Sequence, residues 1–542
     1  MAKKQTSIIN IGITLDKDFI TQYNKLQAEY GVDIAQLNGF GDDQLSYTDF
    51  IDNFIDDDTV ADVSVDGNSN VRRKDIVTLL TEMPKPHRKL LAYNKIYFEL
   101  KKKYGFRTAN TWLENEWSGK LYLHDADTST FKPYCFAYDL KDLAEKGLFF
   151  LGDYLNPQHP KHLVTFIDFV KEYINFASNR SSGACGLPNL IPYMFYFWHK
   201  DVENDYMGIK TSHSEKTYAE QAFQRFIYSV NQPCTRDGQQ SAFTNTSVFD
   251  RPYFEALFGG AIFPDGSFMI DFEEEIIEFQ KWYMETMANI RSETMFTFPV
   301  STISLIRKDG KFTDEEFASW AIKHNMKWCD SNMFIDKDVT SLSNCCRLKS
   351  SIDNLGYFNS IGGTALKVGS VKVGTINLAR IALDTETETE YLSELRKRTL
   401  INLKVLDVVR HIIKRNVDKG LLPNFSYNLI DFGHLYNTIG FTGVYESMRK
   451  FNYIERDVFD NVSYTEQAEK FGEKIFNTIR KTADKFLEDN NCDYLISLEQ
   501  APVEQAASKL IRKDKFFYPD AEIYDLVVSD KCDVNKALHN AD

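Results

Sequence analysis

The chain has 542 residues, of which 43% are hydrophobic and 14% are aromatic. This composition supports a packed core, and the length fits one large α/β barrel with added helices or two to three ordinary domains. The formal net charge of −15 provides no basic footprint, so it excludes a broad surface for nucleic acid or for an anionic membrane.

Neither a secretion signal nor a membrane span is visible in the sequence. The N-terminal lysines are not followed by a long apolar run, and no stretch of about 20 apolar residues with few charges occurs. We therefore expect a cytoplasmic protein without direct membrane or nucleic-acid contact. The eight cysteines include no C-x-x-C pair, which indicates reduced thiols and predicts no cysteine-bound structural metal.

The first elements along the chain are helices. Residues 1–85 are acidic and weakly periodic, and we interpret them as a short helical N-terminal region. A nucleotide-binding regulatory module is the alternative, but no glycine-rich phosphate loop supports it. From Lys85 apolar residues recur at helical spacing as far as Gly105. Two further long helices are predicted over 394–419 and 466–488.

Short apolar or alternating runs between these helices predict β-strands. They lie at 120–124, 134–138, 241–248, 333–335, 371–376 and 494–498. Strands that alternate with long helices favour an α/β fold with a largely parallel sheet, which can close into a barrel.

Two adjacent cysteines, Cys345 and Cys346, stand in the segment S-L-S-N-C-C-R-L. Neighbouring strand residues point to opposite faces, so the pair is better placed in a loop or at a loop tip. Small buried hydrophobic residues are the alternative interpretation. The two thiols are too close together for ordinary metal chelation, and the chain has no second pair.

Several further motifs accompany this pair in a fixed order. They are D-I-V-T-L-L-T-E-M-P-K-P-H (75–87), L-Y-L-H-D-A-D (121–127), G-Q-Q-S-A-F-T-N (238–245), N-C-C-R-L (344–348), V-G-T-I-N-L-A-R-I-A-L (373–383), H-L-Y-N-T-I-G-F-T-G-V-Y-E (434–446) and Q-A-P-V-E-Q-A-A (500–507). Together they resemble the anaerobic, class III ribonucleotide reductases. The resemblance implies a ten-stranded α/β barrel of the ribonucleotide reductase and glycyl-radical enzyme type over 86–542, after the helical region 1–85. The implied reaction converts ribonucleoside triphosphates to 2′-deoxyribonucleoside triphosphates.

The resemblance also assigns the reactive thiols. The family's radical cysteine directly precedes an arginine, which corresponds to Cys346, while Cys345 takes a neighbouring position of open role. A thiyl radical can abstract the 3′ hydrogen of ribose because the S–H bond is comparable in strength to that activated C–H bond. Cys135 corresponds to the second thiol, which supplies reducing equivalents from a barrel strand. A half-buried strand cysteine without chemistry is the alternative.

Polar residues in the matching motifs are candidates for substrate binding. Ser241, Asn245 and Asn377 are expected to hydrogen-bond ribose or phosphate, although Asn377 can equally satisfy local backbone groups at a strand end.

The segment with Ala501, Val503 and Glu504 precedes an alanine-rich helix, whose first amide N–H groups can donate to phosphate, with Mg²⁺ shared between phosphates. An ordinary capped helix start would look the same.

The family implies a glycyl radical that an S-adenosylmethionine/iron–sulfur activase generates. No R-V-x-G-Y-like glycine and no four-cysteine module occur in the sequence. We therefore expect a missing C-terminal segment to supply the radical, as a separate polypeptide, after an interrupted gene, or lost by truncation.

The expected effectors are deoxynucleoside triphosphates and ATP, although no ATP-cone pattern is present. The N-C-C-R-L form and Ser370 favour a dithiol protein similar to thioredoxin or glutaredoxin as reductant, rather than formate. A homodimer is expected, with residues 162–178 at its interface; an ordinary barrel-covering helix is the alternative.

Two other functions are open at this point. One is a glycyl-radical enzyme of the acyl-transferase type, and the other is an inactive nucleotide-binding regulatory subunit. The T-I-N-L-A-R-I and H-D-A-D segments argue against the first, and the presence of both Cys135 and Cys346 argues against the second. His124 is expected to be a hydrogen-bonded core residue.

Overall fold

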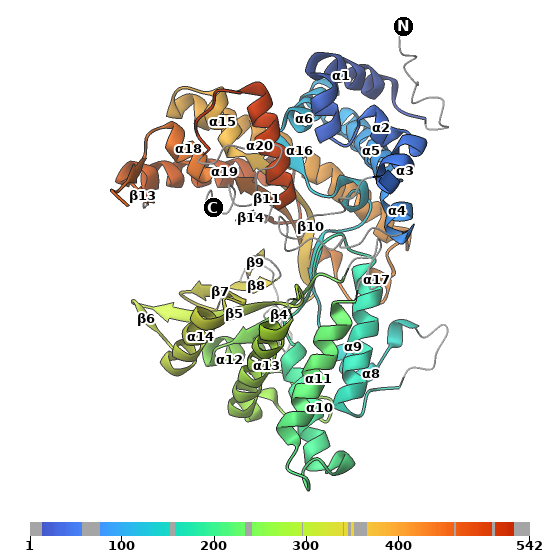
Figure 1. Ribbon diagram of the computed structural model, residues 1–542, viewed down its shortest axis with the longest axis vertical. Helices are drawn as coiled ribbons and strands as arrows, with labels where there is room; N and C mark the ends of the chain where they lie inside the picture. Colours follow the sequence, from blue (N-terminus) through green and yellow to red (C-terminus); the bar gives the residue numbers. More distant parts are fainter. Residues whose placement is uncertain are drawn as a thin grey trace. The chain divides into compact units, whose positions relative to one another are not determined.

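The computed structural model describes residues 14–56, 76–151, 158–232, 241–294, 296–339, 341–344, 348–351, 366–459, 462–500 and 504–524 (Figure 1). The chain divides into two compact units. The first consists of Met1–Phe131, Lys372–Arg415 and Asn437–Asp542, and the second consists of Lys132–Val371 and Asn416–Tyr436.

The first unit begins with helices. These are α1 (Lys17–Leu37), α2 (Asp42–Leu45), α3 (Tyr47–Asp56), α4 (Ile76–Glu82), α5 (Lys85–Tyr104) and α6 (Phe106–Ser118). Gly105 separates α5 from α6 with φ 87°, a conformation that glycine adopts without steric cost. The predicted helix that ends at Gly105 and the helical character of the N-terminal region are confirmed.

Strands and longer helices complete the first unit. Strand β1 (Leu121–Leu123) pairs antiparallel with β10 (Val368–Asn377), and β11 (Leu435–Thr442) pairs parallel with β14 (Ile496–Gln500). The helices are α7 (Ala126–Ser129), α15 (Leu378–Asp384), α16 (Glu388–Asp418), α18 (Val444–Lys450), α19 (Glu466–Asp489) and α20 (Glu504–Phe517), and a hairpin joins β12 (Ile454–Arg456) to β13 (Val462–Tyr464). Leu121, Ile376, Ile439 and Phe471 lie in one buried apolar cluster.

The second unit is a succession of parallel strands joined by helices. The strands are β2 (Cys135–Ala137), β3 (Cys185–Leu187), β4 (Thr244–Phe249), β5 (Val300–Lys308) and β7 (Ser331–Asp336), each parallel to the next. Strand β6 (Lys311–Phe312) forms a hairpin with β5, and the first residues of β10 pair antiparallel with β2. A separate antiparallel pair joins β8 (Ser341–Asn344) to β9 (Leu348–Ser351).

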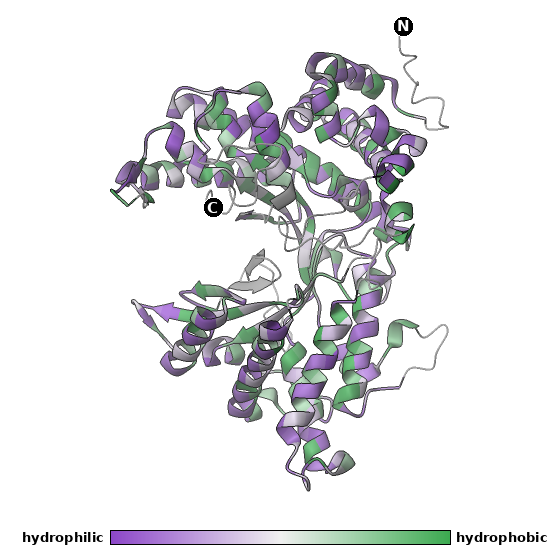
Figure 2. Cartoon of the chain, in the orientation of Figure 1, coloured by the Kyte–Doolittle hydropathy of each residue, from purple (hydrophilic) through white to green (hydrophobic). Residues whose placement is uncertain are grey.

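The helices of the second unit are amphipathic. They are α8 (Lys141–Lys146), α9 (Leu163–Ser178), α10 (Leu190–Glu203), α11 (Glu215–Val230), α12 (Arg251–Phe258), α13 (Glu273–Glu293), α14 (Glu315–Trp328) and α17 (Pro423–Ser426). Figure 2 shows apolar and polar residues alternating along α10 and α11. On α11 the buried residues Ala219, Ala222, Phe223, Phe226 and Val230 recur every three or four positions, which gives the helix one apolar face.

The predicted α/β fold with a largely parallel sheet is confirmed. Ten strands share one sheet, in which the antiparallel pairs are those of β10 with β1 and β2 and of β5 with β6. All six predicted strands are present in whole or in part, whereas the other strands (β3, β5, β6, β8, β9, β11, β12 and β13) had not been predicted. Closure into a barrel and the boundary at residue 85 stay predictions. Within the described ranges, no helix is both long enough and apolar enough to span a bilayer.

Candidate active site

The Cys135 thiol occupies a buried position at the first residue of β2. Its Sγ accepts a hydrogen bond from the backbone N–H of Ala184 at 3.2 Å, and the residue is 5% exposed. Buried Ala184 and Tyr436 pack around it, together with the partly buried Tyr134 and Phe243. The sulfur is therefore held in one place by an apolar shell and a backbone donor.

Gly183 leaves the space that the Cys135 sulfur needs. A Cβ atom built on Gly183 would lie 2.3 Å from Cys135 Sγ and 3.0 Å from the carbonyl oxygen of Tyr134. Real Cβ atoms do not approach other atoms so closely, so a larger residue would displace the thiol.

The strand register places Cys135 and Asn245 on the same face of the sheet. Ala137 pairs with Gly186, and Gly186 pairs with Asn245. Because residues two apart on a strand share a face, the side chain of Cys135 points to the side on which Asn245 lies.

That face continues with small polar residues, and we call Cys135, Asn245, Ser247, Thr302 and Ser304 the polar face. Ser247 and Thr302 are register partners, and Ser304 follows on the same side of β5. Asn245 and the three hydroxyl residues are fully buried. Ser247 Oγ and Ser304 Oγ have no hydrogen-bond partner among the described residues. Buried hydroxyls normally meet a partner, so this face is suited to water or a polar ligand.

The opposite face of the same strands carries apolar residues together with Thr244, Thr246 and Ser301. Phe136 pairs with Cys185, and Val248 pairs with Ile303. Each of these four residues is at most 1% exposed. Both faces are therefore mixed, and the polar face is distinguished by Cys135 and Asn245, which share it.

Ser370 lies directly beside the Cys135 thiol. It is the antiparallel register partner of Cys135 on β10, and it is fully buried. The sequence had singled out Ser370 only for its bearing on the reductant, and its adjacency to Cys135 had no sequence signal.

The two polar residues predicted near β4 differ in position. Ser241 is half-buried, and its Oγ donates to the carbonyl oxygen of Asn231 at 3.0 Å. Asn245 Nδ2 donates to Val300 O and to Thr302 Oγ1, both at 3.0 Å. Only Asn245 belongs to the polar face by register, and substrate binding by either residue stays a prediction.

Asn377, in the first unit, caps helix α15. Its Oδ1 accepts the N–H of Arg380 at 3.1 Å, and its Nδ2 donates to Gly119 O at 3.1 Å and to Asp514 Oδ2 at 2.9 Å. This geometry fits the alternative in which the side chain satisfies local groups at a strand end. A role in ribose binding stays a prediction.

Four of the predicted site residues lie outside the described residues: Cys345, Cys346, Ala501 and Val503. The first two stand in the sequence between β8 and β9, which pair antiparallel. Glu504 is the first residue of α20, and its backbone alone is described. The predicted helix start after the Q-A-P-V segment is thus confirmed.

His124, in the first unit, is the hydrogen-bonded core residue that the sequence predicts. Its Nε2 lies 2.7 Å from Thr375 Oγ1, and the residue is buried. Burial, with the neighbouring Lys372 ammonium, lowers the pKa of His124 to about 3. Lys372 Nζ donates to His124 O and Ser129 Oγ, and desolvation lowers the pKa of Lys372 to about 7.

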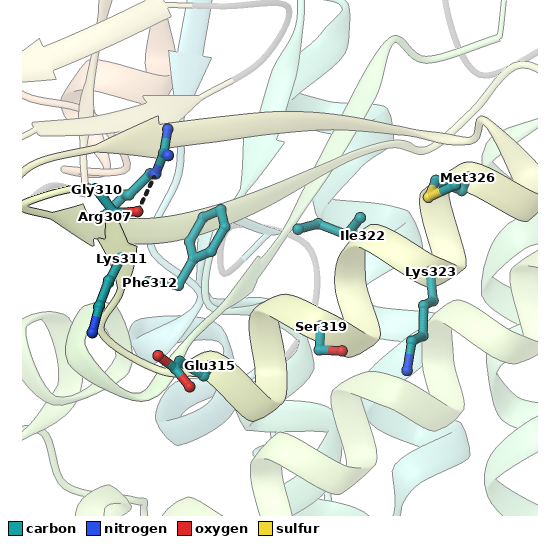
Figure 3. Close-up of a pocket in the computed structure, with 9 residues that line it drawn as sticks. All are labelled: Arg307, Gly310, Lys311, Phe312, Glu315, Ser319, Ile322, Lys323 and Met326. Carbon is teal, nitrogen blue, oxygen red and sulfur yellow. Dashed lines mark hydrogen bonds between the residues drawn. The ribbon is translucent and has the colours of Figure 1, made fainter.

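A separate hollow of about 540 Å³ lies in the second unit, between the β5–β6 hairpin and α14 (Figure 3). Phe312 and Ile322 point toward one another across it, and Arg307 Nε donates to Gly310 O at 3.3 Å. None of the predicted site residues lines this hollow. Among the described residues, no group of three or more histidine, cysteine or acidic side chains is arranged to hold a metal.

Comparisons with known proteins agree with these motifs. A family model described as anaerobic ribonucleoside-triphosphate reductase matches residues 87–538. The anaerobic ribonucleotide reductase from Thermotoga maritima in complex with dATP and CTP is 38% identical, with a TM-score of 0.81 over 94% of this chain and 80% of that chain.

The same enzyme with dATP bound in the specificity site is 38% identical, with a TM-score of 0.80 over 93% of this chain and 80% of that chain. A structure described only as anaerobic ribonucleotide reductase is 37% identical, with a TM-score of 0.81 over 94% of this chain and 77% of that chain. No curated protein matches. By sequence and by structure, the chain belongs to the anaerobic ribonucleoside-triphosphate reductase family of oxidoreductases.

Proposed function

We propose that the chain reduces ribonucleoside triphosphates to 2′-deoxyribonucleoside triphosphates, with Cys135 as a reducing thiol on the polar face. The observation that carries this proposal is the buried, fixed sulfur of Cys135 on a sheet face that also presents Asn245 and the hydroxyls of Ser247 and Ser304 without described partners. Such a face can meet a ribose ring, which is rich in hydroxyls, while excluding bulk water.

The chemistry needs two electrons from the protein. Replacing the ribose 2′-hydroxyl by hydrogen releases water, and the substrate gains two electrons and two protons. Oxidation of two thiols to a disulfide supplies both, and Cys135 is one of the two. A dithiol protein similar to thioredoxin or glutaredoxin then reduces the disulfide, so that electrons balance over one turnover.

Cys346 is proposed to carry the transient thiyl radical that abstracts the 3′ hydrogen, with Cys345 beside it. A glycyl radical made by an S-adenosylmethionine/iron–sulfur activase would supply the unpaired electron. The apolar shell around Cys135 fits radical chemistry, because Ala184 and Tyr436 keep the neighbouring thiol away from water.

Nucleotides are proposed to bind at two kinds of site. The Thermotoga maritima enzyme was crystallised with dATP in its specificity site and, in another complex, with dATP and CTP. By analogy, we assign Mg²⁺-bound ribonucleoside triphosphates as substrates and deoxynucleoside triphosphates or ATP as effectors. The backbone amides around Ala501, Val503 and Glu504 are proposed to hold substrate phosphates. A homodimer through α9 is part of the same proposal.

The test measures deoxynucleotide formation without oxygen. The chain is supplied with CTP, dATP, Mg²⁺, a dithiol protein, and a relative's activated glycyl-radical segment. We expect Cys135→Ser and Cys346→Ala each to lower dCTP formation on the order of 10³-fold or more, because each removes a reacting atom. CTP binding should persist in both variants.

Cys185→Ala is the matched control, since Cys185 is also a buried strand cysteine but lies on the opposite face of the sheet. Its turnover should stay close to that of the unmodified chain. Undiminished dCTP formation by Cys135→Ser would remove the assignment of the reducing thiol. Nucleotide binding without product formation by the unmodified chain would instead favour the regulatory subunit.

A further inference from the structure

Two large apolar side chains lie exposed between β12 and β13 in the first unit, and we call Val458 and Phe459 the hairpin tip. They are 93% and 83% exposed. The base of this hairpin is anchored, because Tyr453 and Ile454 pack against the buried apolar cluster of that unit. The backbone N–H of Phe459 donates to Asp457 Oδ1 at 2.8 Å, which fixes a turn at the tip. An anchored hairpin thus holds two large apolar residues in water.

Acidic residues accompany the hairpin tip. Glu455 is an exposed residue of β12, and Asp457 directly precedes Val458. The basic residue between these two acids is Arg456, whose Nη2 donates to Tyr445 Oη of α18 at 2.7 Å. The tip is therefore an apolar surface bordered by carboxylates.

The hollow beside α14 in the second unit has an apolar lining. Phe312 and Ile322 point toward one another across it, and Met326 lies farther along α14 (Figure 3). Met326 is 81% exposed. Of the four most exposed large apolar side chains in the described part of the chain, three are Val458, Phe459 and Met326. Exposed apolar surface that gathers in one place usually marks an interaction site.

The charge of the hollow is opposite to that of the tip. Arg307, Lys311 and Lys323 line it together with a single acid, Glu315. No ion pair joins any of these three cations to another residue in the ranges that the structure describes. The molecule as a whole carries a formal net charge of −15, so two copies repel each other. A contact between copies needs a local positive surface, and this hollow provides one.

We propose that the hairpin tip of one copy binds in the hollow of a second copy of this chain. Phe459 packs against Phe312 and Ile322 of the second copy, and the acids beside the tip face the cations of the hollow. This inference goes beyond the proposed function and does not rest on it. Each copy has one tip and one hollow, so two copies can exchange tips about a two-fold axis, or many can link head to tail.

The experiment measures self-association of the full chain by sedimentation velocity at increasing protein concentration. Low ionic strength is used, because salt screens exposed charges. We expect Phe459→Ser to raise the dissociation constant of the assembly about tenfold or more, since a central aromatic anchor is lost. A dimer through α9 would remain in this variant, so the proposed contact is measured as the assembly that Phe459→Ser loses.

Charge reversal tests whether tip and hollow bind one another. Glu455→Lys and Lys323→Glu should each weaken association about tenfold, because like charges then face each other. An equal mixture of the two variants should associate within about threefold of the unmodified chain. In that mixture one contact joins an intact tip to an intact hollow, and the other joins two surfaces whose reversed charges attract.

Two control variants carry the same charge changes elsewhere. Glu473→Lys alters an exposed residue of α19, and Lys327→Glu alters an exposed lysine of α14 that does not line the hollow. Both should associate as the unmodified chain does. Circular dichroism of every variant verifies that it is folded.

The outcomes separate the claims. An unmodified chain that is monomeric at every concentration would overturn the contact, and so would association that persists unchanged in Phe459→Ser. A mixture of the charge-reversal variants that associates no better than either alone would show that tip and hollow are not partners. None of these results would touch nucleotide reduction, which is measured separately as dCTP formation.

Discussion

At the residue scale, the position of one sulfur atom depends on a neighbour that has no side chain. A Cβ atom on Gly183 would lie 2.3 Å from Cys135 Sγ, so no larger residue fits there. The backbone N–H of the next residue, Ala184, donates a hydrogen bond to the same sulfur. Gly183 is thus a positioning residue for the proposed reductant.

Gly183→Ala should lower turnover by about tenfold or more, because a displaced reacting atom loses the aligned geometry. The measurement is dCTP formation at saturating CTP, with CTP affinity measured in parallel and expected to change little. Gly472→Ala in helix α19 is the control, since its Cβ would make only an ordinary contact, 3.7 Å from Met448 Cε. Normal turnover in Gly183→Ala would show that the thiol can shift without consequence.

Asn377 is the second residue whose role can be separated by experiment. Asn377→Ala should destabilise the fold by about 1 to 2 kcal/mol, since it removes the α15 cap and a partner of buried Asp514. Chemical denaturation measures this loss. An accompanying rise in KM for CTP at temperatures where the variant is folded would support the ribose-binding interpretation, and an unchanged KM would contradict it.

At the element scale, strand β10 and the turn after β1 share a buried basic network. The His124 ring hydrogen-bonds to the Thr375 hydroxyl of β10, and its centroid lies 4.9 Å from that of Tyr122. Lys372 of β10 donates to the His124 carbonyl oxygen and to Ser129 Oγ of α7. Burial away from water disfavours the charged form of a basic group, and it lowers the pKa values of both His124 and Lys372 below their ordinary values.

Acid should weaken this network. The folded pKa of His124 is about 3, below its ordinary 6.5, so the unfolded chain binds the proton more readily. Its contribution to stability is complete above about pH 6.5 and is lost as the pH falls toward 3. Between pH 6.5 and 5 the loss should be about 2 kcal/mol.

Denaturant unfolding at several pH values measures this loss, and His124→Gln is the informative variant because glutamine can still bond to the Thr375 hydroxyl. The variant should show a shallower dependence on pH over that range. An identical slope for the two proteins would place the acid sensitivity elsewhere.

At the scale of the whole molecule, nucleotides that bind only the folded chain should stabilise it. At a concentration 100 times its Kd, each ligand adds about 2.7 kcal/mol to the free energy of unfolding. If substrate and effector occupy separate sites, CTP and dATP together should raise the melting temperature beyond either alone. Differential scanning calorimetry measures this. A midpoint that CTP cannot raise further in saturating dATP would indicate one shared site.

Much of the architecture could be predicted from local pattern. The long helices α5, α16 and α19 were found because apolar residues repeat at helical spacing over several turns. Strand β3 was not, since three residues, C-G-L, carry no periodicity. The mixed direction of the sheet also had no local signal, because strand direction is set by pairing between distant segments.

The sequence by itself determined the family and the α/β class, because ordered motifs and helical spacing are written along the chain, and it proposed Cys135 and Cys346 as the reacting thiols. Only the tertiary structure decided which side Cys135 faces, that Ser370 lies beside it, and that Lys513 meets Asn38 from 475 residues away. Register and long-range packing create these neighbours, and no local pattern of residues encodes either.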